Sequence, residues 1–85
     1  MELADLVDRI PVGWNDVRYR GRRWAIRRAD HAGGRTVTIE AEALGGPERI
    51  GANVIRLSSG DLLRPCEIPE RTVLDLLEGW EAAPA

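Results

Sequence analysis

Two segments, one near each end of the chain, carry apolar residues at the spacing of an amphipathic helix. The i, i+3, i+4, i+7 pattern is formed by Leu3, Leu6, Val7 and Ile10 in residues 2–10, and by Val73, Leu76, Leu77 and Trp80 in residues 69–80. Pro11 ends the first helix, and Pro69 suits the first position of the second. The pattern therefore predicts a helix at each end of the domain.

Between these helices the apolar residues alternate with polar ones, as they do in half-buried strands. Residues 14–29 predict a β-hairpin with Gly21-Arg22 as its two-residue turn. In that register Tyr19 lies opposite Trp24 and Val17 lies opposite Ile26. The register predicts one apolar face and one charged face for the hairpin; the apolar face holds Val17, Tyr19, Trp24 and Ile26, and the charged face holds Asp16, Arg18, Arg20, Arg23 and Arg27.

Residues 36–44 predict a third strand, which follows a turn at residues 30–35 and places Val37, Ile39, Ala41 and Ala43 on one face. Pairing with residues 23–29 sets Ile39 opposite Ile26 and Glu42 opposite Arg23. Residues 53–57 and 62–67 predict a second hairpin after a loop at 45–51. Pro65 lacks a backbone donor, so it indicates an edge strand or a strand end.

The expected fold class is therefore α+β, in the order α-β-β-β-β-β-α. An antiparallel sheet of about five strands, with both helices on one face, buries all of these apolar positions. With 85 residues in all, the chain has room for one core, which we place in residues 1–80. Residues 81–85 are expected to form a flexible tail.

Composition narrows the function only slightly. All 12 basic residues are arginines, and the formal net charge is −2, which argues against a protein that coats nucleic acid. A single Cys and a single His cannot make a disulfide framework or a structural zinc site, and we expect no metal and no cofactor. No membrane-length apolar run or signal peptide is visible, so a cytoplasmic location is expected.

The arginine-rich hairpin is the first candidate binding site. Arg18, Arg20, Arg23 and Arg27 share one face in the predicted register and could contact phosphates or an acidic partner. Tyr19 and Trp24 fall on the opposite, apolar face, which argues against base stacking. Glu40 and Glu42 would lie among the arginines, so a solvated face with cross-strand ion pairs is the favoured interpretation.

Cys66 is the single candidate catalytic residue. It precedes a predicted helix N-terminus, where the helix dipole would favour a thiolate, but Glu67 beside it acts in the opposite sense. A lone cysteine is most often buried and inert, and this interpretation is favoured over a reactive thiol. His31, the one imidazole, falls in a predicted turn, and nothing in the sequence brings it to Cys66.

Four runs together resemble a family of small uncharacterised bacterial proteins, some of which carry the label peptide methionine sulfoxide reductase. They are Tyr19-Arg20-Gly21-Arg22-Arg23-Trp24, Ala32-Gly33-Gly34-Arg35, Ala41-Glu42-Ala43-Leu44-Gly45-Gly46 and Arg64-Pro65-Cys66-Glu67-Ile68-Pro69. The label implies Cys66 as nucleophile. The first type of these reductases presents its cysteine in a Gly-Cys-Phe-Trp motif, whereas here Pro65 and Glu67 flank it and an external thiol would have to act as resolving group.

Three functional hypotheses follow. The leading one is a small non-catalytic domain that acts through a protein partner or as a homodimer. The second is a thiol-dependent reductase that uses Cys66, and the third is an anion or nucleic-acid binder that uses the Arg18–Arg27 face.

Overall fold

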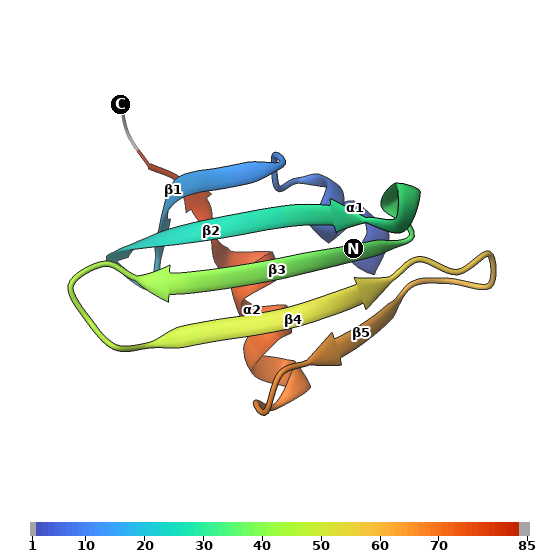
Figure 1. The fold of residues 1–85 in the computed structure, drawn as a ribbon. Helices are drawn as coiled ribbons and strands as arrows, with labels where there is room; N and C mark the ends of the chain where they lie inside the picture. The colour runs from blue at the N-terminus through green and yellow to red at the C-terminus, as the bar shows by residue number, and fades with distance from the viewer. Residues whose placement is uncertain (1, 84–85) are drawn as a thin grey trace.

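The computed structural model describes residues 2–83, which form a curved sheet with helices behind it (Figure 1). In chain order the elements are α1 (Leu3–Asp8), β1 (Gly13–Tyr19), β2 (Arg22–His31), a 3-10 turn (Ala32–Gly34), β3 (Thr36–Ala43), β4 (Arg49–Ile55), β5 (Leu62–Pro65), α2 (Glu70–Gly79) and β6 (Glu81–Ala82). The predicted helices and the predicted strand at 36–44 are all present, with ends shifted by at most two residues.

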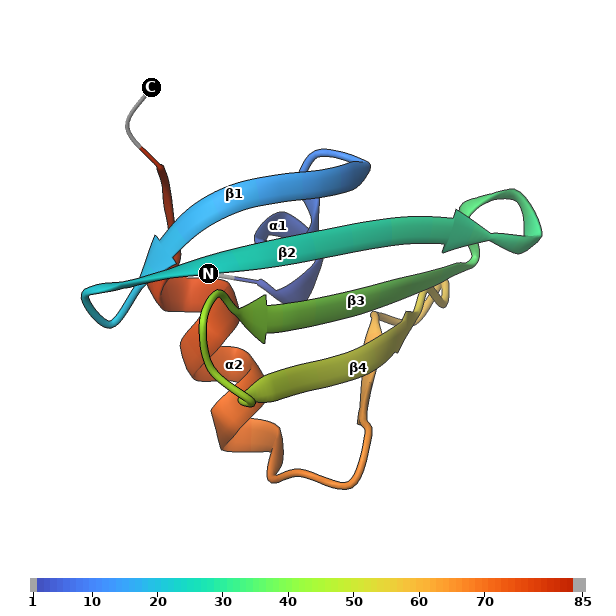
Figure 2. The same cartoon turned by 60° about the vertical axis from the view of Figure 1, so that its left-hand side comes forward.

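The sheet has the strand order β5-β4-β3-β2-β1-β6, and every neighbouring pair is antiparallel. Both helices lie on the same face, and α2 crosses beneath the strands (Figure 2). This is the predicted α+β layout with one strand more. The prediction of a flexible tail from residue 81 is wrong at its start, because Glu81 and Ala82 pair with Arg18 and Val17; residues 84–85 lie outside the described range.

A single apolar layer fills the space between the sheet and the helices. The fully buried side chains come from alternate strand positions and from the inner faces of both helices: Val7, Ile10, Val17, Ile26, Val37, Ile39, Val54, Val73, Leu76 and Leu77. Burying a side chain of this size contributes roughly 1.5–3 kcal/mol. About half of the side chains of each strand point into this layer. The other half point away from the helices and form the open face of the sheet.

The turn between β1 and β2 differs from the predicted one. Its central residues are Arg20 and Gly21, with φ of 52° and 72°, so that Tyr19 pairs with Arg22 and Val17 with Trp24. Two consecutive positive φ values define a type I′ turn, whose twist matches that of the strands. The predicted register is therefore wrong by two residues. A shift of two preserves the faces, and Val17, Tyr19, Trp24 and Ile26 are buried as predicted.

The predicted pairing of β2 with β3 is also wrong by two residues. Ile26 lies opposite Ala41, and Arg27 rather than Arg23 lies opposite a glutamate, Glu40. Because the shift is an even number of residues, the same side chains again point toward the core. In the second hairpin β4 begins at Arg49, four residues earlier than predicted, and β5 is the edge strand that Pro65 indicated.

Two arginines from distant parts of the chain cap the C-terminal ends of the helices. Arg28 Nη1 donates to the carbonyl oxygens of Val7 and Ile10 at 3.2 and 2.9 Å. Arg9 donates to those of Leu77 and Trp80 at 3.1 and 3.2 Å. Cationic groups are favourable at this end of a helix because its last carbonyls lack partners. Arg28 therefore fastens α1 to β2, and Arg9 fastens α1 to the end of α2.

The type I′ turn predicts the effect of one substitution. Gly21→Ala should lower the free energy of unfolding by about 1 kcal/mol, because alanine is strained at φ 72° although nothing lies within 4 Å of the added methyl group. Urea denaturation of the two proteins measures the difference. An unchanged or higher stability would contradict this assignment of the turn.

Asp30, the carboxylate partner of Arg28, makes the stability of the protein depend on pH. Two hydrogen bonds from Arg28 hold the pKa of Asp30 below its ordinary value of 3.8. A depressed folded-state pKa adds stability that is complete above the unfolded value and is lost as the pH falls through the folded one. We expect wild type to exceed Asp30→Asn in stability by a constant margin above about pH 5, and that margin should shrink as the pH falls below 3.8. A stability difference that does not change down to pH 2 would refute this role of Asp30.

Candidate functional site

The open face of the sheet contains a groove at its centre, with a cavity volume of about 340 Å³. Its lining includes the side chains that project from this face and backbone of the strands beneath: Trp14, Thr38, Ile39, Glu40, Ala41, Glu42, Arg49, Ile50, Gly51, Ala52, Asn53 and Cys66. We call it the central groove. Its walls come from β1, β3, β4 and the residue after β5, and it extends along residues 38–42 of β3 and 49–53 of β4.

The floor of the central groove is Gly51, and strand pairing explains its position. Trp14, Arg27, Glu40 and Gly51 follow one another across β1 to β4, and Cys66 donates its backbone N–H to Gly51 O at 3.0 Å. At the usual strand spacing this row is about 19 Å long. Every other residue of the row has a side chain, so the missing one at Gly51 leaves the hollow.

Backbone geometry does not require glycine at position 51. Its φ lies outside the left-handed region, and an added Cβ would make ordinary contacts of 3.8 to 3.9 Å with Cys66 Cβ and Sγ and with Ile39 O. Glycine inside a strand costs roughly 0.5–1 kcal/mol relative to alanine. The sequence therefore carries a glycine that the fold neither needs nor favours, and its visible effect is the groove.

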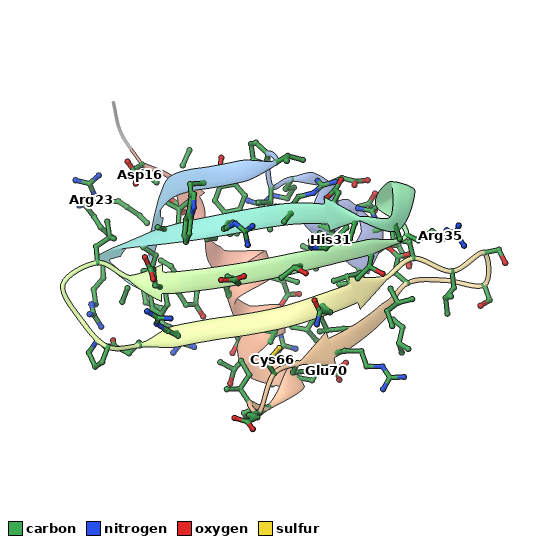
Figure 3. The ribbon with its side chains drawn as sticks, viewed as in Figure 1. Asp16, Arg23, His31, Arg35, Cys66 and Glu70 are labelled. Atoms are coloured by element: carbon green, nitrogen blue, oxygen red, sulfur yellow. The ribbon has the colours of Figure 1, made fainter. Side chains whose placement is uncertain are left out.

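Polar side chains on one flank of the groove form a connected chain. Thr38 Oγ1 donates to Asn53 Oδ1 at 2.9 Å and lies 3.1 Å from His31 Nε2. Because the threonine proton is committed to Asn53, His31 is the donor in the second bond. Thr38 and Asn53 line the groove, whereas His31 lies at the far end of β2, away from Cys66 (Figure 3).

The arginines of the hairpin are neutralised locally. On the open face Arg23 lies 3.7 Å from Asp16, and Arg27 hydrogen-bonds to Glu40 at 3.0 Å. The pair of Arg23 and Asp16 stands at the end of the sheet near the β1–β2 turn (Figure 3). The predicted cross-strand ion pairs are therefore present, although their partners follow the shifted register.

Arg18 and Arg20 fall in different places. Arg18 projects from the open face next to Arg23, its pairing partner on β2. Arg20 was predicted on the same face, and this is wrong: it occupies the turn and reaches Asp75 of α2 at 3.6 Å, on the helix side. The four arginines therefore do not form one continuous basic surface.

Cys66 is exposed, so the prediction that it is buried is wrong. It lies at the rim of the central groove, where the chain leaves β5 and Glu67 adopts a φ of 56° to turn toward α2. His31 makes no contact with it. A role for Cys66 as a nucleophile stays a prediction.

The sequence pattern missed the groove itself. Trp14 is 58% exposed, whereas Trp80 is buried. Nothing in the alternation of residues 49–55 marks Gly51, which was assigned to a loop. Strand pairing is what sets Gly51 between Glu40 and Cys66, and a pairing partner is not visible in a single strand's sequence.

Among the described residues, no group of three or more His, Cys, Asp or Glu side chains is arranged to hold a metal ion. No helix within residues 2–83 is long and apolar enough to cross a membrane.

Comparison with known proteins provides no family assignment, so a function has to be inferred from the geometry of the structure. No protein-family model matches the chain, and neither a curated protein nor a solved structure shows significant similarity to it. The resemblance to the small bacterial family therefore stays a prediction.

Proposed function

We propose that this domain is a protein-interaction module whose central groove binds an extended segment of a partner protein. The observation that carries the proposal is Gly51, a strand glycine that the backbone does not require and that hollows the middle of an uncovered sheet face. A row of about 19 Å accommodates roughly six residues of extended chain.

The charges of the groove indicate what the segment carries. Two carboxylates line the groove: Glu40, which accepts a hydrogen bond from Arg27 at 3.0 Å, and Glu42, which faces Arg49. Glu42 and Arg49 are 3.7 Å apart, so neither charge is fully neutralised by this ion pair. A basic side chain of the partner would complement Glu42, whose distance to Arg49 leaves room for a closer cationic partner.

Trp14 supplies the second element of recognition. An indole that is 58% exposed at the end of the groove offers a large rigid surface, and tryptophan is enriched among residues that dominate interface energies. Its face attracts both apolar groups and cations. We therefore infer a partner segment with a lysine or arginine next to an apolar residue.

Filling the groove is the direct test. Gly51→Val places two methyl groups above the floor, and β-branched residues favour strands, so stability should rise by up to about 1 kcal/mol. Peptides selected from a displayed random library against wild type should share a basic residue beside an apolar one. Their affinity for Gly51→Val, measured by Trp14 fluorescence or calorimetry, should fall at least roughly tenfold, the loss expected when a central contact is blocked.

Ala29→Val provides the matched control. Ala29 projects from the same open face, pairs with Thr38 and lies outside the groove. The Ala29→Val substitution also places two methyl groups on this face. The affinity of the peptides for this variant should equal their affinity for wild type. Equal binding by Gly51→Val and wild type, or a library that yields no shared sequence, would refute the proposal.

A further inference from the structure

A second cavity of about 470 Å³ lies at the end of the sheet where the β1–β2 turn, the start of β4 and the first turn of α2 meet. We call it the terminal cavity. Its lining consists of Tyr19, Arg20, Arg22, Trp24, Glu48, Arg49, Ile50 and Thr72. It shares Arg49 and Ile50 with the wall of the central groove, and its remaining residues are its own.

Hydrogen-bond donors dominate this lining. Three guanidinium groups, those of Arg20, Arg22 and Arg49, face a single carboxylate, that of Glu48. Thr72 contributes a hydroxyl from the first turn of α2, a ten-residue helix whose N-terminal end carries partial positive charge. The residues lining the cavity carry three positive charges and one negative charge; Asp75 and Glu42, which do not line it, lie 3.6 and 3.7 Å from Arg20 and Arg49.

Trp24 adds a donor that the protein leaves unused. The residue is only 6% exposed, and its indole Nε1–H has no hydrogen-bond partner among the described residues. A buried N–H without a partner costs on the order of 1–3 kcal/mol, so native structures rarely leave one. Trp24 forms part of the cavity wall, although its indole nitrogen is itself shielded from solvent, as is that of Trp80, which also lacks a partner.

Arg22 is held in place by the local backbone. A side chain at Gly46 would begin 2.6 Å from Arg22 Nη2 and 2.7 Å from Glu48 Oε1, so the ion pair of Arg22 and Glu48 occupies the space that glycine leaves free. The hydrogen bond from Arg22 keeps the pKa of Glu48 below its ordinary value. The guanidinium is thus oriented before any ligand arrives.

We propose that the terminal cavity binds the phosphate monoester group of a small molecule. A phosphate monoester carries a charge of about −1.5 to −2 at neutral pH and three acceptor oxygens, one for each of the three guanidiniums, which have N–H groups beyond their single contacts with Asp75, Glu48 and Glu42. Arginine pairs with such oxyanions through two parallel N–H groups. Tyr19, Trp24 and Ile50 give the cavity an apolar side for the rest of the molecule, and its volume falls in the usual range for small-ligand sites.

The experiment is a titration of the ¹⁵N-labelled protein with inorganic phosphate and with phenyl phosphate, followed through the Trp24 indole N–H and the Thr72 amide. Both signals should shift with saturation, and phenyl phosphate should bind more tightly than phosphate. Its affinity should increase between about pH 5 and 7, as its second ionisation proceeds. No shift of Trp24 at millimolar ligand, or shifts spread evenly over all arginine-rich surfaces, would overturn the proposal.

Two matched arginine variants identify the site. Arg20 lies in the β1–β2 turn and Arg23 lies in β2 close to it, and each lies 3.6 to 3.7 Å from one acidic partner, but of the two only Arg20 lines the cavity. Arg20→Gln should weaken phenyl phosphate binding roughly fivefold, and Arg23→Gln should leave it unchanged. Glu48→Gln removes the one carboxylate and should strengthen binding. Equal effects of Arg20→Gln and Arg23→Gln would show nonspecific attraction and refute the site.

These variants also separate the two proposals. Arg20 and Thr72 do not line the central groove, and Gly51 does not line the terminal cavity. Phenyl phosphate binding should be the same in Gly51→Val and wild type, and peptide binding should be the same in Arg20→Gln and wild type. Each of the two proposals can therefore be refuted independently of the other.

Discussion

The rest of the structure depends on one apolar layer between the sheet and its two helices. β1 to β4 contribute alternate residues to it, and α1 and α2 contribute the stripes that their sequence spacing predicts. A domain this small buries a limited share of its surface, and most of its large aliphatic side chains lie in this layer, with Val12, Leu44, Leu57 and Leu62 exposed. As a consequence the opposite face of the sheet receives the polar, charged and small residues, and no helix covers it (Figure 2).

Charged residues stabilise this arrangement at its ends rather than inside it. Arg28 is only 13% exposed, lies beyond the last apolar position of β2 and satisfies carbonyl groups at the end of α1. Arg9 acts in the same way on α2 and also lies over the Trp80 ring at 4.9 Å. Guanidinium groups suit this role because they donate several hydrogen bonds at once and still reach water.

Both candidate sites arise where a side chain is missing or a donor is unused. In the central groove Gly51 leaves a hollow that a larger residue would fill without strain. In the terminal cavity three arginines, each with one acidic partner, have further N–H donors, and the Trp24 N–H has no acceptor among the described residues. The local ion pairs also explain why the hairpin is not a broad polyanion surface, since Arg23 and Arg27 already have acidic partners on the same face.

The sequence by itself determined the two helices, the alternation of the strands, the α+β class and which face of each strand is buried. These follow from periodicity, which is a local property. Only the tertiary structure decided the register, because the type I′ geometry at Arg20 and Gly21 competes with an equally plausible turn one residue later, and both keep the same faces buried. It also brought Gly51 between Glu40 and Cys66, exposed Cys66, and gathered Arg20, Arg22 and Arg49 around Trp24. These positions depend on which strand pairs with which, and that is settled by the packing of the whole layer.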